Sequence, residues 1–410
     1  MKPDLDVIVA GGGMVGACLA ALCAQAGGQK ALRVAVIEPN PPAAFDPASD
    51  VALRVSAVSR ASQHVLQAAG AWLLISRERI GPYREMRVWD AGEDLSAGGG
   101  IHFDSADIGE SDLGHIIENN LMQWALWECL ASLKNVELIN KVALESLEFG
   151  DDVATVQLNN GRVLKASLIV GADGARSHVR ALAGIETRGW GYDQKAVVAH
   201  VKTESAHGET AWQRFLPTGP LAFLPLADGR SSIVWSTTPA QADELLALDT
   251  ETFNAEVTRA SDRVLGAVVD SGQRAVFPLR LQHATHYTHP RCALIGDAAH
   301  AVHPLAGQGV NLGYLDAAAL TEVVVAAHAA GLDPGDHPVL RRYERWRKGE
   351  NVFSMATMDG LKRLFGNSSV TVGYGRRVGL RLVNRARPLK NLFMRRAMGL
   401  SGDLPKLARR

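Results

Sequence analysis

The sequence of 410 residues contains few cysteines, few aromatic residues and no excess of charge of either sign. Its four cysteines are too scattered for the disulfide framework of a small secreted protein, so that class is excluded. Cys18 and Cys23 lie near each other in the first expected helix, where a redox pair would be one interpretation. We interpret them as small buried residues, because that helix is apolar along its length.

Long apolar runs are also missing, since no stretch approaches the roughly 20 residues that a membrane-spanning helix needs. The first residues show no basic region followed by an apolar stretch and a cleavage site, so we expect no secretory signal. Hydrophobic residues make up 47% and charged residues 21%, which is the balance of a soluble globular protein. We therefore expect a cytoplasmic protein, long enough for two packed domains or for one large fold with an inserted second layer.

The formal net charge of zero hides an uneven distribution along the chain. Residues 376–410 contain eleven Lys and Arg against the single acid Asp403, so the remainder of the chain must be acidic. We expect no nucleic-acid binding, because the basic residues are confined to this tail and no recognition motif accompanies them. The tail indicates either association with a membrane surface or a partner complex, or a basic helix packed on the acidic remainder.

Within this tail, apolar residues recur at helical spacing after Pro388. They are Leu389, Leu392, Phe393, Ala397 and Leu400. We expect Lys390 and Arg395 to lie outside this stripe, as in an amphipathic helix on a membrane surface. Peripheral association with the inner membrane is therefore an alternative to a purely cytoplasmic location.

The first 40 residues have the pattern of a strand, a tight turn, a helix and a second strand. Residues 5–10 and 32–37 are apolar and of strand length, and residues 14–26 form an uninterrupted run of small and apolar residues. This order and length predict a βαβ unit.

The turn of this unit carries a G-x-G-x-x-G motif. Gly11 permits the sharp turn, Gly13 lets the backbone approach a pyrophosphate, and Gly16 lets the helix pack closely on the strand. A phosphate would sit at the helix N-terminus, where unpaired N–H groups favour negative charge. Glu38 ends the second strand and is placed to accept hydrogen bonds from the ribose hydroxyls of an adenosine. The motif predicts a bound dinucleotide, and by itself it does not distinguish NAD from FAD.

The middle of the chain has a different pattern. Four strand-length runs with turn residues between them predict an antiparallel sheet, distinct from the βαβ part. These runs are 196–201, 211–216, 221–226 and 231–236. Residues 91–114 are rich in Gly, Ser and Asp and predict a long loop or a weak hairpin, and the residues after Gly309 predict helices.

Two further strands each end in a turn that carries an aspartate. The strand 167–170 leads into Asp173-Gly174, and the strand 292–295 leads into Gly296-Asp297 and then His300. An NAD dehydrogenase has no use for these two turns. A continuation with several glycines runs from His303 to Gly313 and leads into a helix.

These motifs resemble those of the single-component flavoprotein hydroxylases of the para-hydroxybenzoate hydroxylase fold. Within that fold the sequence is similar to the FAD-dependent aromatic hydroxylases of ubiquinone biosynthesis (the UbiH, UbiF and UbiI type). The run from His303 to Asp316 matches their signature, and stretches 54–57, 117–120, 222–226 and 340–344 support the resemblance. The likeness covers nearly the whole chain.

The resemblance implies an α/β fold, with a Rossmann-like FAD-binding domain and a substrate domain built on an antiparallel sheet. C-terminal helices complete it. The implied FAD-binding domain is discontinuous and comprises residues 1–80, 115–185 and 288–360. The implied substrate domain comprises 81–114 and 186–287, and a basic helical region covers 361–410.

The resemblance also implies which residues form the site. Asp297 would bind the ribityl chain, and the loop from Gly307 to Asn311 would direct N–H groups at the pyrimidine edge of the flavin. Gln123 stands where many relatives have an arginine against FAD, so its role departs from the pattern. The implied cofactor-binding residues are Gly11, Gly13, Met14, Val15, Gly16, Glu38, Pro39, Arg54, Gln123, Asp173, Gly174, Gly296, Asp297, Pro304, Gly307, Gln308, Gly309, Val310 and Asn311. The implied catalytic residues are His303, Pro304 and Gly307.

The implied reaction is hydroxylation of the aromatic ring of a polyprenylated phenol or quinol, with NAD(P)H and O₂, through a flavin hydroperoxide. The preferred substrate is 2-polyprenylphenol, and the later methoxy-methyl-benzoquinol is an alternative. A flavin-dependent isoprenoid reductase and a non-catalytic prenyl-binding protein use the same fold and also remain open. We expect no metal, and the sequence leaves homo-oligomerisation open.

Overall fold

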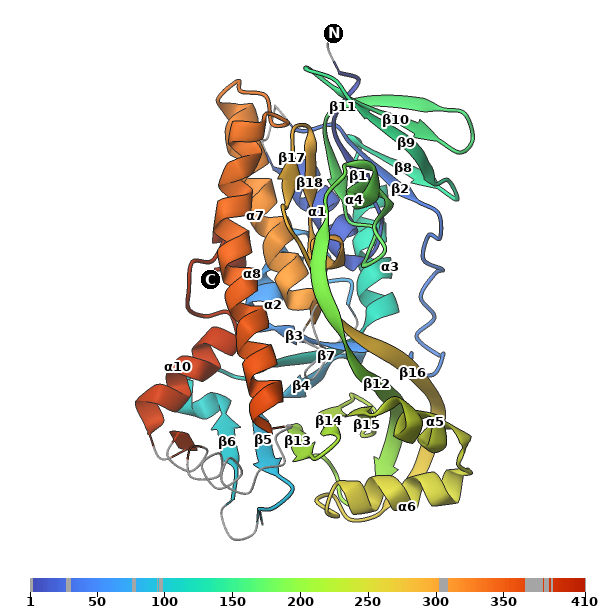
Figure 1. Ribbon diagram of the computed structural model, residues 1–410, viewed down its shortest axis with the longest axis vertical. Coiled ribbons are helices and arrows are strands. Elements are labelled where there is room, and N and C mark those ends of the chain that lie inside the picture. Colours follow the sequence, from blue (N-terminus) through green and yellow to red (C-terminus); the bar gives the residue numbers. More distant parts are fainter. Residues whose placement is uncertain are drawn as a thin grey trace.

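In the part of the chain that it describes, the computed structural model shows three sheets with helices packed on them (Figure 1). The structure describes residues 3–26, 31–75, 79–93, 95, 99–301, 309–365, 379, 383–384 and 386–409. Within these residues, the first sheet lies at one end of the molecule and the second at the other, with the small third sheet between them (Figure 1).

The first sheet has a parallel centre. Its hydrogen-bonded order is β17-β18-β11-β1-β2-β8, with β10 joined to β11 and β9 joined to β10. The strands are β1 Leu5–Ala10, β2 Val34–Glu38, β8 Val136–Asn140, β9 Leu144–Phe149, β10 Ala154–Leu158, β11 Val163–Gly171, β17 Thr288–His289 and β18 Cys292–Leu294. Because β18, β11, β1, β2 and β8 are parallel, their carboxyl ends lie along the same edge.

Continuous apolar runs explain this parallel centre. Residues 7–9 of β1 and 168–170 of β11 are completely buried, as expected for strands covered on both faces. The covering helices are α1 Met14–Gln25, α2 Arg60–Ala68, α3 Asn119–Ala131, α4 His178–Leu182, α7 Gly309–Ala329 and α8 His337–Phe365. Helix α1 packs against both α3 and α7, which its small residues allow. The predicted βαβ unit is confirmed.

The second sheet has the order β19-β16-β12-β15-β14-β13-β5-β6. Its strands are β5 Glu85–Asp90, β6 Ile101–Asp104, β12 Thr187–Thr203, β13 Thr210–Leu216, β14 Gly219–Pro225, β15 Ser231–Thr237, β16 Val268–Ala284 and β19 His300–Ala301. The predicted antiparallel strands are present, although β13 and β5 pair in parallel. Helices α5 Pro239–Ala247 and α6 Thr250–Ala260 pack on β12 and β16.

The hairpin that the sequence offered as an alternative to a loop at residues 91–114 is present among the residues described there. Strand β6 pairs antiparallel with β5, and a 3₁₀ turn (η3, Ser105–Ile108) follows it. The expected α/β class is confirmed, with an antiparallel-rich second sheet. The proposed domain boundaries stay a prediction; β19, at residues 300–301, joins the second sheet.

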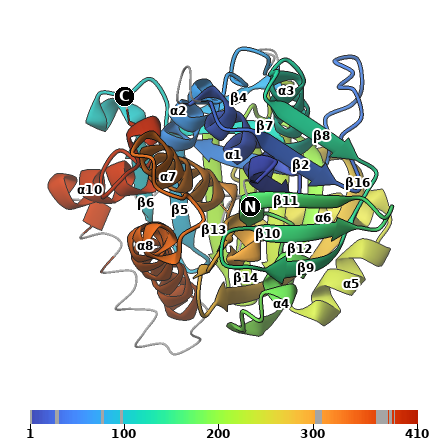
Figure 2. The same ribbon diagram turned by 90° about the horizontal axis from the view of Figure 1, so that it is seen from above.

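The small sheet is formed by β3 Val55–Ser59, β7 Gly114–Glu118 and β4 Gly81–Tyr83, in the order β3-β7-β4. A C-terminal helix, α10 Arg387–Ala397, packs Met394 into the apolar cluster that contains Tyr83 and Ile116. The C-terminal region therefore returns to the small sheet, beside α8 in both views (Figures 1 and 2).

Helix α7 corrects the expectation that no apolar run reaches membrane-spanning length. By length and composition α7 could cross a membrane, and it is the one such helix among the residues described. However, 56% of its most apolar window is buried inside the protein, where it packs against α1 and α8. Because Asp316 lies completely buried within it, we interpret α7 as a core helix.

Cys18 and Cys23 are buried as predicted, Cys292 is buried as well, and burial makes these three thiols unreactive. Desolvation raises the pKa of the Cys23 thiol to about 12 and those of Cys18 and Cys292 further, while Cys129 is half-buried. We expect Ellman's reagent at pH 8 to modify at most Cys129 in the native protein, because the thiolate is the reactive form. All four thiols should react after unfolding in guanidinium. Rapid modification of two or more native thiols would contradict this prediction.

Candidate functional site

The three predicted motifs meet at one edge of the first sheet. Ala10 of β1 pairs with Gly171 of β11, and Gly171 pairs with Leu294 of β18. The glycine loop, the Asp173 turn and the Gly296 turn each begin one or two residues beyond these strand ends. Stretches far apart in the sequence therefore share one carboxyl edge, which is where ligands of parallel α/β sheets bind.

The glycine loop has two positions where packing leaves no room for a side chain and one where the space is open. Gly11 has a φ of +104°, and a Cβ there would lie 2.4 Å from the carbonyl oxygen of Ala172. A Cβ on Gly16 would lie 2.0 Å from the carbonyl oxygen of Gly11. By contrast, a Cβ on Gly13 would meet no protein atom within 4 Å. Gly13 precedes α1 as its N-cap, so the open space lies at a helix N-terminus, as an anion site requires.

Side chains from β2 and α3 hold this loop. The Glu38 carboxylate accepts hydrogen bonds from the Gly12 N–H (2.7 Å) and the Asn40 N–H (2.8 Å). The Gln123 amide and the Trp127 indole N–H both donate to the Gly12 carbonyl oxygen, at 3.0 and 2.7 Å. Sequence reasoning missed Trp127, because a tryptophan inside an apolar helix forms no motif. Gln123 therefore supports the glycine loop directly, through its hydrogen bond to Gly12.

The Asp173 turn keeps one carboxylate oxygen available. Its Oδ2 accepts from the N–H groups of His178 (2.7 Å) and Val179 (3.0 Å), which begin α4. Its Oδ1 is buried and has no hydrogen-bond partner among the described residues. Gly174 adopts a φ of +81° with open space around it. A polar ligand that entered the open space beside Gly174 could donate a hydrogen bond to this oxygen.

Arg180 connects the second motif to the third. Its guanidinium donates to the carbonyl oxygen of Ala175 and to that of Ala298, both at 2.8 Å. This side chain is buried, and desolvation lowers its pKa. Because it bridges the two turns, Arg180 fixes their relative positions.

The Gly296-Asp297 turn packs directly on the glycine-loop helix. Gly296 has a φ of +57°, and a Cβ on Gly313 of α7 would lie 2.6 Å from Val15 of α1. The Asp297 side chain is accessible to solvent, yet the protein atoms around it raise its pKa by desolvation, and the charges of His300 and Arg54 oppose that rise. Asp297 is thus an exposed acceptor beside a cation.

Arg54 brings the second sheet to this edge. Its guanidinium lies over the ring of Phe277 in β16, 5.5 Å from the ring centroid. The segment before Arg54 is held by Arg79, which forms a bidentate pair with the buried Glu118 at 2.7 and 2.9 Å. Arg79 also donates to the carbonyl oxygen of Ser49. Sequence reasoning missed Arg79, because its partners lie about 30 and 39 residues away.

The start of α7 is described only in part. Gly309 and Val310 are half-buried at its first turn, and Asn311 ties it to β3. Asn311 donates to the Ala57 carbonyl oxygen at 2.8 Å and accepts from the Ser59 N–H at 2.9 Å. The other residues predicted in this loop lie outside the described residues: His303, Pro304, Gly307 and Gln308.

A buried carboxylate supports the Gly296 turn from behind. Asp316 accepts from the Gly296 N–H (3.2 Å), His300 Nε2 (2.5 Å), Arg347 Nε (2.9 Å) and the Asn351 amide (3.0 Å). Burial by itself would raise the pKa of Asp316, but His300 and Arg347 more than offset this and lower it to about 2. Asp316 is therefore ionised and fully paired.

Helix α8 completes this network. Arg347 and Asn351 both come from α8, and Tyr343, one turn earlier, donates to the Leu294 carbonyl oxygen at 2.8 Å. Burial and the nearby charges of His300 and Lys348 lower the pKa of His283, which contacts Tyr287 in the same network, to about 4. In the sequence, Asp316 and Tyr343 lie in stretches that match a family. The sequence did not show that both hydrogen-bond the backbone at the start of the Gly296 turn.

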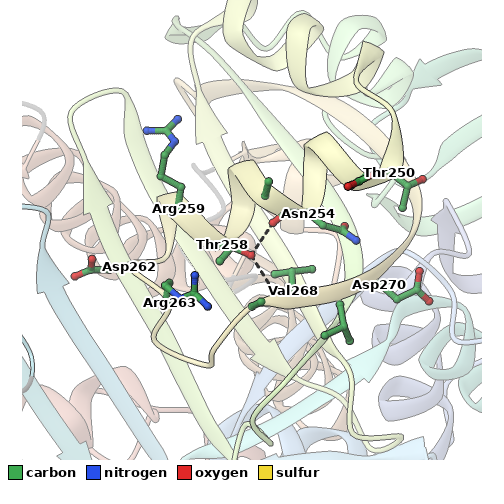
Figure 3. Close-up of a pocket in the computed structure, with 12 residues that line it drawn as sticks. Thr250, Asn254, Thr258, Arg259, Asp262, Arg263, Val268 and Asp270 are labelled. Atoms are coloured by element: carbon green, nitrogen blue, oxygen red, sulfur yellow. Dashed lines mark hydrogen bonds between the residues drawn. The ribbon is translucent and has the colours of Figure 1, made fainter.

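Two other features of the molecule lie apart from this edge. A cavity of about 810 Å³ lies between α6 and the beginning of β16, where Thr258 accepts from the Val268 N–H (Figure 3). None of the residues predicted to bind the cofactor lines it. Among the described residues, Glu85, His102 and Asp104 lie close enough together to hold a metal ion, at the β5–β6 pair of the second sheet.

Comparisons with known proteins agree with this geometry. A family model described as an FAD binding domain matches residues 4–348. Ubiquinone hydroxylase UbiL of Rhodospirillum rubrum is 40% identical over 407 residues, which cover 98% of this chain and 92% of that protein. The 3-demethoxyubiquinol 3-hydroxylase of Escherichia coli K12 is 38% identical over 395 residues, which cover 96% of this chain and 98% of that protein. The structure of p-nitrophenol 4-monooxygenase PnpA of Pseudomonas putida DLL-E4 shares the fold, with a TM-score of 0.77 at 21% identity. The match covers 98% of this chain and 100% of that one.

The glycine loop yields a prediction that separates binding from folding. Gly13→Ala should lower the melting temperature of the flavin-free protein only slightly, because its Cβ meets only open space and alanine is merely a poorer N-cap than glycine, but should weaken FAD binding on the order of tenfold or more. Gly16→Ala should lower the melting temperature itself, by overpacking worth about 1–3 kcal/mol. Gly349→Ala, in open space on α8, is the matched control. Unchanged FAD affinity in Gly13→Ala would contradict the predicted pyrophosphate site.

The Asp316 network yields a second prediction. Asp316→Asn should destabilise the protein by about 3–5 kcal/mol, because Arg347 loses its buried counter-ion. Since the pKa of Asp316 is depressed in the folded state, its contribution is present above the unfolded value of about 4 and is lost as the pH falls towards 2.

Thermal unfolding between pH 2 and 7 measures this contribution. The melting temperature of Asp316→Asn should fall less than that of the wild type as the pH is lowered through this range. The double variant Asp316→Asn/Arg347→Met should be more stable than Asp316→Asn, since it removes the unpaired cation. Equal stability of the wild type and Asp316→Asn at pH 7 would show that the pair is unimportant.

Proposed function

The chain belongs to the FAD binding domain family and is an FAD-dependent monooxygenase, and from this premise we propose that it hydroxylates the ring of a polyprenylated phenol or quinol in ubiquinone biosynthesis. The observation that carries the proposal is the meeting of the glycine loop, the Asp173 turn and the Gly296 turn at one sheet edge. The relatives named as ubiquinone hydroxylases match over almost the whole chain, which supports the pathway.

The residues at this edge fit FAD. The open space at Gly13 and the N-terminus of α1 would hold the pyrophosphate, and Glu38, at the end of β2, would accept from the adenosine ribose. Asp297 would accept from the ribityl hydroxyls, and Oδ1 of Asp173, which has no hydrogen-bond partner among the described residues, is a further acceptor. FAD, when bound, supplies the electron transfer and oxygen activation that protein side chains lack.

The start of α7 and Arg54 would act on the flavin ring. The first N–H groups of α7, at Gly309 and Val310, point along a helix N-terminus and would stabilise negative charge on the pyrimidine edge. Asn311 holds that helix end on β3, so the dipole is fixed before the cofactor binds. The charges of His300 and Arg54 oppose the rise that desolvation causes in the pKa of Asp297, so Arg54 would favour the ionised form of that carboxylate.

The second sheet would supply the substrate side. Phe277 of β16 lies against Arg54, so an apolar ring from the second sheet reaches the same edge as the cofactor residues. An aromatic substrate placed there would be covered by apolar surface, which excludes water from the reaction. We propose NAD(P)H as the reductant. The sequence contains no second G-x-G-x-x-G loop of the βαβ type, which is consistent with a nicotinamide that binds only transiently.

Two ring substrates are candidates. The resemblance seen in the sequence favours 2-polyprenylphenol, and the name of the Escherichia coli relative favours a late demethoxyubiquinol. Disrupting the gene and identifying the accumulated prenylated intermediate by mass spectrometry separates them. Wild-type complementation should restore ubiquinone, and Gly13→Ala should restore it less than Gly349→Ala does.

The reaction class is tested with the purified protein. We expect a yellow flavoprotein whose NAD(P)H oxidation is stimulated by the prenylated ring and which incorporates one atom of labelled O₂ into the product. Stimulated oxidation without label would indicate an isoprenoid reductase. Prenyl binding without flavin absorption would indicate a non-catalytic binding protein. Either outcome would replace the proposed hydroxylase.

A further inference from the structure

Five large apolar side chains are exposed on α8 and α10, two helices that meet where Arg396 of α10 contacts α8 and that are neighbours in both views (Figures 1 and 2). We call this surface the α8–α10 face; its residues are Val352 and Phe353 of α8 and Leu389, Leu392 and Phe393 of α10. Their exposed fractions are 43, 52, 41, 55 and 50%. Arg396 joins the two helices, because it pairs with Glu350 at 3.0 Å and lies over the Phe353 ring at 4.4 Å.

The orientation of α10 differs from the one expected from its sequence. Lys390 was expected outside the apolar stripe, but it is buried, and its ammonium group pairs with Asp107 at 2.7 Å. Met394, one turn later, is buried in the cluster under the small sheet. Since Lys390 and Met394 occupy the inner side of α10, Leu392 and Phe393 are left on the outer side.

The charge around this face is positive. Helix α10 carries four basic residues and no acid. Lys390 is compensated by Asp107 and Arg396 by Glu350. Among the described residues, Arg395 donates only to the Ile108 carbonyl oxygen, at 3.2 Å. Within the described part of the chain, the excess positive charge of the helix therefore comes from Arg387 and Arg395, both exposed.

We propose that the α8–α10 face docks peripherally on an anionic lipid bilayer. A bilayer offers apolar volume for Leu392 and Phe393 and anionic headgroups for the arginines at the rim. A second copy of the chain would instead bring the same arginines together. Five side chains are also few against the roughly 20–30 residues per partner of a stable protein interface. The proposal is independent of the proposed function, because docking is measured without turnover.

Co-sedimentation of the full-length, flavin-loaded protein with vesicles tests the docking. We expect binding to vesicles of phosphatidylcholine and phosphatidylglycerol, weakened by salt, and little binding to phosphatidylcholine alone. Leu392→Ser/Phe393→Ser should weaken binding on the order of tenfold or more per side chain, because each loses its apolar burial. Leu246→Ser, at another exposed leucine (44%) on α5, is the matched control and should bind as the wild type does.

A charge variant tests the second half of the proposal. Arg387→Gln/Arg395→Gln should reduce the salt dependence of vesicle binding, and melting temperatures should show that all variants fold. The proposal is overturned if the wild type does not bind anionic vesicles at low salt. It is also overturned if Leu246→Ser weakens binding as much as the double serine variant does. Concentration-dependent dimerisation that the double serine variant abolishes would assign the face to a second copy instead.

Discussion

A single buried carboxylate organises the flavin edge of this protein. Asp316 is completely inaccessible to solvent and accepts from a backbone N–H, a histidine, an arginine and an amide. An unpaired charge at this depth would be very costly, so the donors must hold their positions around it. Two of these donors, Arg347 and Asn351, come from α8 and lie outside every sequence motif, and a third is the Gly296 N–H. The turn before Asp297 is therefore tied to α8.

Close approach of backbones is the second constraint, and it explains why the site needs glycines. Gly11 touches the chain after β11, and Gly313 of α7 touches Val15 of α1. Any side chain at these positions would separate the strand ends that carry the three motifs. Gly13 differs, since the space beside it is open in the protein itself. Packing and ligand binding thus make distinct demands on glycines that look identical in the sequence.

The site also depends on the meeting of two sheets. The parallel sheet supplies the glycine loop and both aspartate turns, while β16 of the second sheet brings Phe277 to Arg54. The Arg79–Glu118 pair fixes the segment that leads to Arg54. A monooxygenase must hold cofactor and substrate in register and exclude water, and residues from two sheets at one edge are suited to that task.

The amino-acid sequence by itself determined the βαβ unit, the antiparallel strands of the middle region and the dinucleotide-binding glycine loop, because these follow from local periodicity and from glycine spacing within a few residues. The roles of the other motifs at a flavin were implied by their resemblance to a known family. Only the tertiary structure decided that Trp127, Arg79, Arg180 and Arg347 support the site, since their partners are remote in the chain and leave no local pattern. It also decided which side of α10 faces inward. The charge pattern placed Lys390 outside, but Asp107, 283 positions earlier in the sequence, draws it in and leaves Leu392 and Phe393 exposed.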